Sequence, residues 1–208
     1  MPGTLTIVND TTLILASASP RRSALLRQIG VAHAVAAPAV LEVRAAGETV
    51  EACVSRLALT KARQIRERVA GVPILGADTA VVLDEQMLGK PTDRATALAM
   101  MGRLSGRAHR VLTAVALLSV HGERVLLSAS SVQFRRIEPA EMARYWDSAE
   151  PVDKAGGYAI QGYAAVFVEQ LQGSYSGVMG LPLFETAALL DAAGVPRWQT
   201  IDRRAESH

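Results

Sequence analysis

The sequence predicts an α/β protein with a mixed, twisted sheet and flanking helices. Segments with strand character alternate with segments of helical spacing along the 208 residues, and this alternation is typical of α/β folds. Several successive strands are separated only by short turns, so they are expected to pair as antiparallel hairpins. The two observations together favour a mixed sheet over a purely parallel one.

The N-terminal part is expected to hold one strand and two helices. The apolar run Leu13–Ala16 predicts a short buried strand. A helix follows, with Ser19 as its N-cap, Pro20 at its first position and Gly30 after its end. A second, long helix is expected over 48–70, and the glycine that follows it marks its end.

The central part is expected to form two hairpins with a helix between them. In chain order the expected elements are strands over 73–83 and 87–88, a helix over 92–104, and strands over 111–120 and 124–136. The first hairpin turns near Asp84, and the second turns through His121 and Gly122. Ala95, Leu98 and Met101 recur at helical spacing within the central helix.

The C-terminal part is expected to combine helices with glycine-rich strands. The expected elements are a helix over 139–147, strands over 156–161 and 165–171, an ordered loop over 173–177 and a helix over 182–193. Three glycines within 156–162 indicate a close approach of this backbone to a ligand or to another strand. The polar tail over 196–208 is expected to be flexible.

Composition excludes several function classes. The net charge of +2 and an aromatic content of 4% argue against an extended nucleic-acid surface. We expect no membrane-spanning segment and no signal peptide, because long apolar runs are absent from the sequence. Cys53 is the single cysteine, and the four histidines are scattered without zinc spacing. A cytoplasmic setting is the resulting expectation.

The stretch Ser17-Ala18-Ser19-Pro20-Arg21-Arg22 joins the first strand to the first helix. A helix N-terminus carries free N–H groups and a positive dipole, so two arginines there are unfavourable unless an anion binds. Guanidinium groups match phosphate oxygens well. The stretch therefore indicates a phosphate site, although two solvated surface arginines would explain it as well.

Two further charged residues interrupt apolar patterns, and a third lies close to them in the chain. Lys61 falls in the apolar stripe of the long helix, where an unpaired ammonium would be costly, unless the side chain extends to solvent. Asp78 lies within the apolar strand over 73–83, so its carboxylate needs a cation, a metal or N–H donors, unless Gly76 marks a bulge. Lys90 follows the same hairpin. These residues predict metal-assisted chemistry on a phosphate chain.

Six motifs in this order closely resemble the Maf family of nucleoside triphosphate pyrophosphatases. They are SASPRR, LTKAR, LGADTAVV, LGKP, KAGGYAIQG and GSYSGVMGLPLFET, and the resemblance runs from Leu13 to Gly194. It implies a single domain over 1–208 with an anvil-like fold similar to inosine triphosphatases and a cleft between two lobes. It also implies cleavage between the α and β phosphates of a nucleoside triphosphate, with a divalent cation (Mg²⁺ or Mn²⁺).

The resemblance assigns roles to residues of this chain. Asp78 would be the general base that activates water, and Asp78 and Glu42 would hold the metal. The acidic residues that precede Glu42 in many members are replaced here by Ala39-Val40-Leu41. The residues that would line the triphosphate site are Ser17, Arg21, Arg22, Lys61 and Lys90.

Three positions favour the pyrimidine branch of the family, which acts on dTTP and UTP. Arg21, Thr79 and Gln161 match the residues of that branch, and Gln161 offers both a donor and an acceptor to a uracil or thymine edge. The alternatives are the branch that acts on 7-methyl-GTP, and a non-catalytic nucleotide- or nucleic-acid-binding regulator of septum formation. The implied partners are a nucleoside triphosphate and a second copy in a homodimer, with no stable nucleic acid and no membrane.

Overall fold

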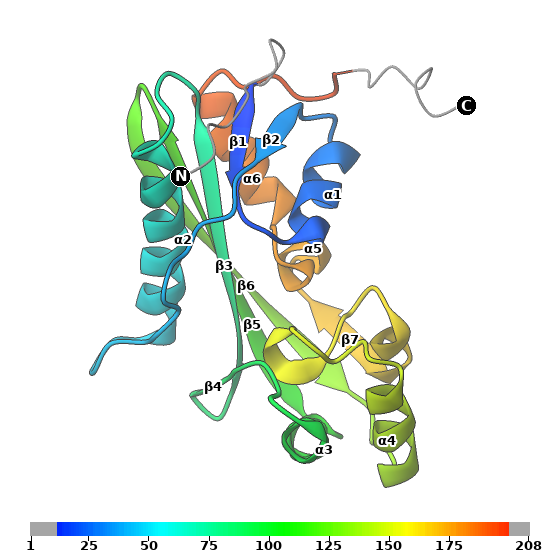
Figure 1. Ribbon diagram of the computed structural model, residues 1–208. Coiled ribbons are helices and arrows are strands. Elements are labelled where there is room, and N and C mark those ends of the chain that lie inside the picture. The colour runs from blue at the N-terminus through cyan, green and yellow to red at the C-terminus, as the bar shows by residue number, and fades with distance from the viewer. Residues whose placement is uncertain (1–11, 200–208) are drawn as a thin grey trace.

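The computed structural model describes residues 12–199, which are built around one mixed sheet of seven strands (Figure 1). The strands are β1 (Leu13–Ala16), β2 (His33–Val35), β3 (Ile74–Leu83), β4 (Gln86–Leu88), β5 (Ala108–Ser119), β6 (Gly122–Phe134) and β7 (Val168–Gln172). Their order is β2-β1-β3-β5-β6-β7, and β4 pairs with β3. β1 runs parallel to β2 and β3, whereas all other pairs are antiparallel, so the predicted mixed sheet is confirmed.

Helices cover both faces of the sheet. They are α1 (Pro20–Gln28), α2 (Val50–Arg66), α3 (Arg94–Leu104), α4 (Pro139–Asp147), α5 (Tyr175–Met179) and α6 (Leu183–Ala192), with 3-10 turns η1 (Ala155–Gly157) and η2 (Tyr163–Phe167). Figure 1 shows α2 on one side of the sheet and α1, α5 and α6 on the other, while α3 and α4 lie at the far end. No helix in the described range is long and apolar enough to cross a membrane.

The expected strand over 156–161 is wrong. The chain forms the η1 turn there, because Gly156 and Gly157 have φ angles of 72° and 68°, in the left-handed region that a strand does not use. A Cβ on Gly156 would lie 2.9 Å from the Cγ atoms of Val81, so this glycine does bring the backbone close to another strand. The glycine-rich segment is therefore a tight turn packed on β3.

Smaller differences concern short elements. The strand expected over 165–171 begins only at Val168, because 163–167 form η2. The three-residue strand β2 and the five-residue helix α5 were not expected, since neither is long enough to show a period. Ser19 takes the N-cap position of α1 as expected, but its side chain makes no capping hydrogen bond. Of the predicted tail, Trp198 and Gln199 donate backbone hydrogen bonds to Ile29 and Gly30, and 200–208 lie outside the described residues.

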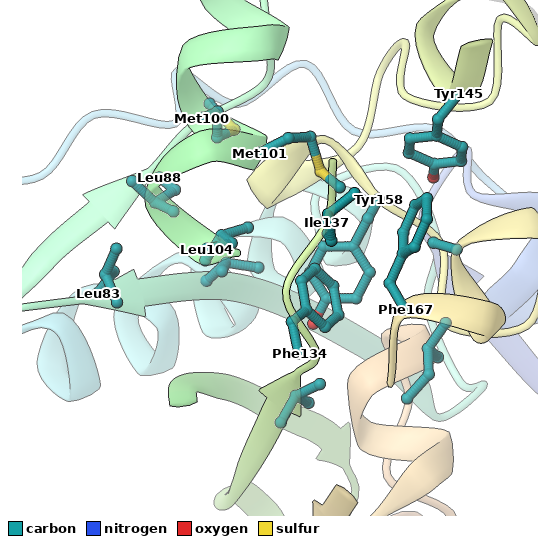
Figure 2. Close-up of a cluster of buried hydrophobic side chains, with 14 of the residues drawn as sticks. Leu83, Leu88, Met100, Met101, Leu104, Phe134, Ile137, Tyr145, Tyr158 and Phe167 are labelled. Atoms are coloured by element: carbon teal, nitrogen blue, oxygen red, sulfur yellow. The ribbon is translucent and has the colours of Figure 1, made fainter. Parts of the chain in front are cut away.

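The apolar residues form separate clusters on the two halves of the sheet. Near α3 and α4, the cluster includes Leu83, Leu88, Met101, Leu104, Phe134, Tyr158 and Phe167 (Figure 2). Near α1 and α6, a second cluster includes Leu13, Leu15, Leu25, Leu26, Leu75, Leu189 and Leu190. β3 contributes to both clusters, so this strand links the two halves of the molecule.

Helix α2 lies directly on β3 at Gly76. A Cβ on this residue would lie 2.2 Å from the carbonyl oxygen of Ala58 and 3.0 Å from the nitrogen of Ala62. Both are backbone atoms of α2, which cannot move without shifting the whole helix. The absence of a side chain at Gly76 therefore sets how close α2 approaches β3.

Replacement of Gly76 by alanine should lower the free energy of unfolding by about 1–3 kcal/mol, because α2 must move away from the sheet. Urea denaturation measures the change. Gly102→Ala is the matched control, because Gly102 lies in α3 and a Cβ added there would have no neighbouring atom within 4 Å. This change should stabilise the protein by about 0.5–1 kcal/mol. Equal stability of wild type and Gly76→Ala would contradict the close packing.

His109 is a buried titratable group whose ring packs against Phe134 and Tyr158, two residues of the cluster near α3 and α4. It is 3% exposed, its Nε2 lies 2.8 Å from the hydroxyl of Tyr158, and its ring meets Phe134 edge-on. Burial lowers the pKa of His109 from 6.5 to about 4. The unfolded chain thus binds a proton below about pH 6.5 that the folded protein accepts only near pH 4.

The folded protein should therefore lose stability as the pH falls from about 6.5 toward 4. Between pH 7.5 and pH 5, His109 should contribute a loss on the order of 2 kcal/mol. The measurement is urea denaturation of wild type and His109→Gln at both pH values, since the variant retains all other titrating groups. If the pH dependence of the two proteins is the same, His109 is not the source of the effect.

Candidate active site

A gap along one edge of β3 forms a cleft of about 490 Å³. β5 pairs with one edge of β3 from Ile74 to Val82. On the other edge, β1 pairs only as far as Gly76, and β4 begins to pair at Val81. The short stretch of β3 between them is unpaired on this edge. Side chains from both faces of the strand can therefore reach the cleft, because successive strand residues point to opposite faces.

The cleft brings all the sequence-predicted site residues together. Its lining includes Ser17, Arg21, Arg22, Glu42, Lys61, Asp78, Thr79, Lys90 and Gln161. They come from the β1–α1 junction, the loop before α2, α2 itself, β3, the segment after β4 and the turn before η2. The structure thus places them in one site, although it does not assign their roles.

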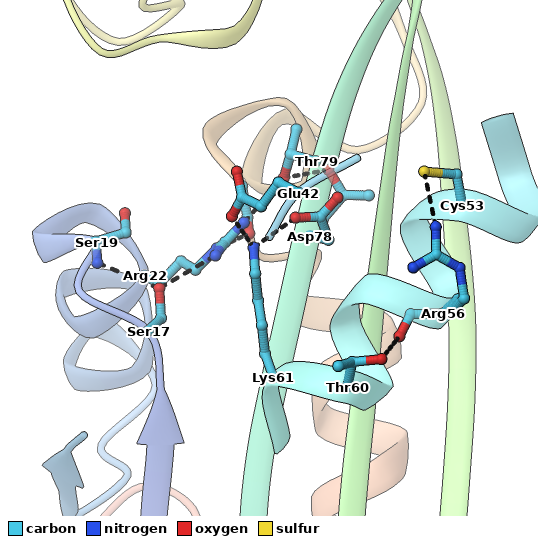
Figure 3. Close-up of polar contacts among 12 residues, drawn as sticks. Ser17, Ser19, Arg22, Glu42, Cys53, Arg56, Thr60, Lys61, Asp78 and Thr79 are labelled. Atoms are coloured by element: carbon cyan, nitrogen blue, oxygen red, sulfur yellow. Dashed lines mark hydrogen bonds and ion pairs between the residues drawn. The ribbon is translucent and has the colours of Figure 1, made fainter. Parts of the chain in front are cut away.

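Lys61 joins two carboxylates at the centre of this cleft. Its Nζ donates a hydrogen bond to Oδ1 of Asp78 at 2.6 Å and forms an ion pair with Glu42 (Figure 3). Lys61 and Asp78 are each 6% exposed. The apolar stripe of α2 places Lys61 against β3, and the pairing compensates for burying both charges.

The two carboxylates differ in their surroundings. Burial raises the pKa of Asp78 above its usual value, although the charges of Lys61 and Arg22 oppose this effect. Partial burial also raises the pKa of Glu42, but the hydrogen bond from Lys61 and the charges of Lys61, Lys90 and Arg22 together lower it below its usual value. Burial thus favours the protonated form of Asp78, whereas the neighbouring cations favour the ionised form of Glu42.

The guanidinium group of Arg22 donates hydrogen bonds to three oxygen atoms of the protein. Its Nε donates to the carbonyl of Gly180 at 2.8 Å, its Nη1 to Oγ of Ser17 at 3.1 Å and its Nη2 to Oγ1 of Thr79 at 3.3 Å. Figure 3 shows the side chain lying between Ser17 and Thr79. Arg22 therefore connects the start of α1 with β3 and with the loop after α5.

Arg21 and Lys90 differ from Arg22. Both side chains line the cleft, and within the described part of the chain neither forms a hydrogen bond or an ion pair. Lys154, which the sequence patterns did not single out, also lines the cleft, and burial together with the charge of Arg21 lowers its pKa. The feature of the sequence that could have identified Lys154 as a site residue is its position just before the glycine turn. Over residues 12–199 none of these three cations is paired with a carboxylate, so they are available for an anionic ligand.

Thr79 is held on the opposite face of β3 from Asp78. Its hydroxyl is hydrogen-bonded to the hydroxyl of Thr113, with the two oxygens 3.0 Å apart. Thr113 is also 2.8 Å from the carbonyl oxygen of Gly177 in α5 and directly opposite Thr79 in β5. The loop over 173–180, which the sequence left without a role, thus forms one wall of the cleft through Gly180 and helix α5.

The residues present fit a divalent cation that is shared with a substrate. The described residues contain no group of three or more histidine, cysteine or acidic side chains that could hold a metal by themselves. Glu42 and Asp78 nevertheless converge on one ammonium group, so their oxygens lie close together. Mg²⁺ is commonly bound by one or two carboxylates together with water and substrate phosphates.

The sequence of this chain matches a known family and several curated proteins. The family described as "Maf-like protein" matches residues 12–193. A dTTP/UTP pyrophosphatase of Alkalilimnicola ehrlichii is 56% identical over 86% of this chain and 91% of its own length. Proteins of the same name from Saccharophagus degradans and Burkholderia pseudomallei are 49% and 50% identical, over 93% and 87% of this chain and 94% and 93% of theirs.

One solved structure has a more distant similarity. The nucleoside-triphosphatase / dITP/XTP pyrophosphatase of Mycobacterium abscessus aligns with a TM-score of 0.39 and 21% identity. The alignment covers 60% of this chain and 75% of that chain.

The contacts of Arg22 predict that it stabilises the fold more than its neighbour does. Arg22→Lys should lower the free energy of unfolding by about 1–3 kcal/mol, because one ammonium cannot reach all three acceptors. Arg21→Lys is the matched control and should stay within about 0.5 kcal/mol of wild type. Thermal and urea denaturation measure both effects. Equal stability of the two variants would show that the Arg22 contacts contribute little.

Proposed function

This chain belongs to the Maf-like protein family, and we propose that it hydrolyses dTTP and UTP to the nucleoside monophosphate and pyrophosphate. The observation that carries the proposal is the buried Lys61–Asp78 pair beside three further cations in one cleft. A triphosphate supplies the negative charge that those cations lack, and a carboxylate with a raised pKa suits proton abstraction from water. The names of the similar proteins support the same substrates.

In the proposed mechanism, Asp78 accepts a proton from the water that attacks the α-phosphate. Lys61 fixes the orientation of this carboxylate through the hydrogen bond at Oδ1. Arg21, Lys90 and Lys154 stabilise the charge that develops on the departing pyrophosphate. Ser17 and Arg22 shape the phosphate end of the cleft through their mutual hydrogen bond.

A divalent cation fits the same arrangement. Glu42 and Asp78 would hold Mg²⁺ or Mn²⁺ together with phosphate oxygens, and the cation would supply neutralisation of phosphate charge when bound. Lys61, which pairs with both carboxylates, keeps them together when they are not bound to the cation.

Base recognition is proposed for Gln161, which lines the same cleft. Gln161 is exposed there, and its side-chain amide can both donate to and accept from the O4 and N3 edge of uracil or thymine. Arg21 and Thr79 complete the set of residues that we assign to pyrimidine selection. Thr79 acts through its hydrogen bond with Arg22.

The experiment that tests this function measures pyrophosphate release from dTTP, UTP, CTP, dATP, GTP and 7-methyl-GTP. We expect activity concentrated on dTTP and UTP with Mg²⁺ or Mn²⁺, and none after addition of EDTA. Activity concentrated on 7-methyl-GTP would overturn the base assignment. Nucleotide binding without pyrophosphate release from any substrate would overturn the assignment as an enzyme.

Asp78→Asn provides the mechanistic control for that assay. It should lower kcat by about 10²- to 10⁴-fold and change KM little, because it removes the proton acceptor and leaves the cations in place. Asp147→Asn is the matched change at an exposed position of α4 and should retain full activity. Near-full activity of Asp78→Asn would rule out Asp78 as the general base.

A further inference from the structure

Gln161 lies in a short turn whose conformation determines where its side chain reaches. The turn is closed by a hydrogen bond of 3.0 Å from the Gly162 N–H to the Ala159 carbonyl. Within the described range, the side chain of Gln161 makes no hydrogen bond to the protein and is exposed. Only the backbone of the turn can therefore fix the position of the amide group in the cleft.

One carboxylate holds the far side of this turn. The Glu150 side chain accepts hydrogen bonds from the backbone N–H groups of Tyr163 at 2.9 Å and Ala164 at 3.2 Å. It also sits against Gly162, since a Cβ on that glycine would lie 2.0 Å from Oε2 of Glu150. The carboxylate thus fills the space that a side chain at position 162 would need.

The same carboxylate reaches the near side of the turn through Tyr145. Tyr145 is buried. Its hydroxyl donates a hydrogen bond to Oε1 of Glu150 at 2.8 Å and accepts a hydrogen bond from the backbone N–H of Ala159 at 3.2 Å. Ala159 precedes Gln161 by two residues, and Tyr163 follows it by two. Glu150 is therefore linked to the backbone on both sides of Gln161, directly at Tyr163 and through the Tyr145 hydroxyl at Ala159.

We propose that Glu150 is a positioning residue for base selection, which acts by holding the turn that presents Gln161 to the nucleobase. This inference rests on the proposed function, because it takes Gln161 as the residue that contacts the base. Glu150 does not itself line the cleft. Loss of its carboxylate charge weakens the hydrogen bonds to Tyr163 and Ala164, and the turn then samples other positions.

The test compares kcat/KM for UTP and CTP, which share ribose and triphosphate and differ at the base edge. Gln161→Ala should lower the UTP-to-CTP ratio about 10-fold or more, and Glu150→Gln should lower it about 3- to 10-fold. The double variant should have the ratio of Gln161→Ala alone, because Glu150 acts through Gln161. Glu150→Gln keeps the backbone carbonyl that accepts Lys154 Nζ at 2.5 Å, so the cation stays in place.

Glu169→Gln is the matched control, because Glu169 is exposed on β7 and makes no side-chain hydrogen bond within residues 12–199. It should keep the wild-type ratio. Tyr145→Phe removes the hydroxyl that links Glu150 to Ala159 and should lower the ratio in the same direction, which provides a second variant if Glu150→Gln does not fold. Hydrogen exchange supplies a readout without activity: the amides of Tyr163 and Ala164 should exchange faster in Glu150→Gln.

The outcomes separate this inference from the proposed function. If Gln161→Ala lowers the ratio and Glu150→Gln leaves both the ratio and amide exchange unchanged, the role of Glu150 is overturned and the function stands. If Gln161→Ala leaves the ratio unchanged, the base contact fails, and the selectivity role of Glu150 fails with it. If the wild-type protein releases pyrophosphate from neither nucleotide, the proposed function itself is overturned.

Discussion

The pairing of Lys61 with Asp78 and Glu42 is the interaction on which the rest of the site depends. A buried ammonium and a buried carboxylate are each very unfavourable alone, so α2 and β3 must hold them within hydrogen-bond distance. The glycine at position 76 permits that distance, because α2 backbone atoms occupy the space of a side chain. A packing contact between apolar surfaces thus determines the geometry of the charged centre.

β3 connects this charged centre to the apolar clusters in both halves of the molecule. Its first residues lie in the cluster near α1 and α6, and its last residues lie in the cluster near α3 and α4. The residues between them are paired on one edge only, so the strand is rigidly held at both ends of an open stretch. A site on such a strand has accurate side-chain positions and direct access for a ligand, which loops alone rarely combine.

Much of the site could be predicted from sequence because its residues contradict their local patterns. Asp78 is a charge within a strand, and Lys61 is a charge within an apolar helical stripe. The contacts of Arg22 with Gly180 and Thr79 could not be predicted, since these acceptors are 158 and 57 positions away in the sequence. The strand expected over 156–161 was wrong because apolar residues around glycines resemble a strand. That pattern shows neither the positive φ angles of Gly156 and Gly157 nor the close approach of Gly156 to Val81. Strand β2 and helix α5 were too short to carry a period.

The hydrogen bond between Arg22 and Gly180 spans 158 positions of the chain. During synthesis the N-terminal strand, the first helix and β3 all leave the ribosome long before the carbonyl that Arg22 needs. Contacts of such large sequence separation form late, because closing the long loop costs entropy first. A nascent or truncated chain that ends before residue 180 therefore lacks one of the three acceptors of Arg22 and part of one wall of the cleft. The protein acquires its cleft only when nearly all of it has been made.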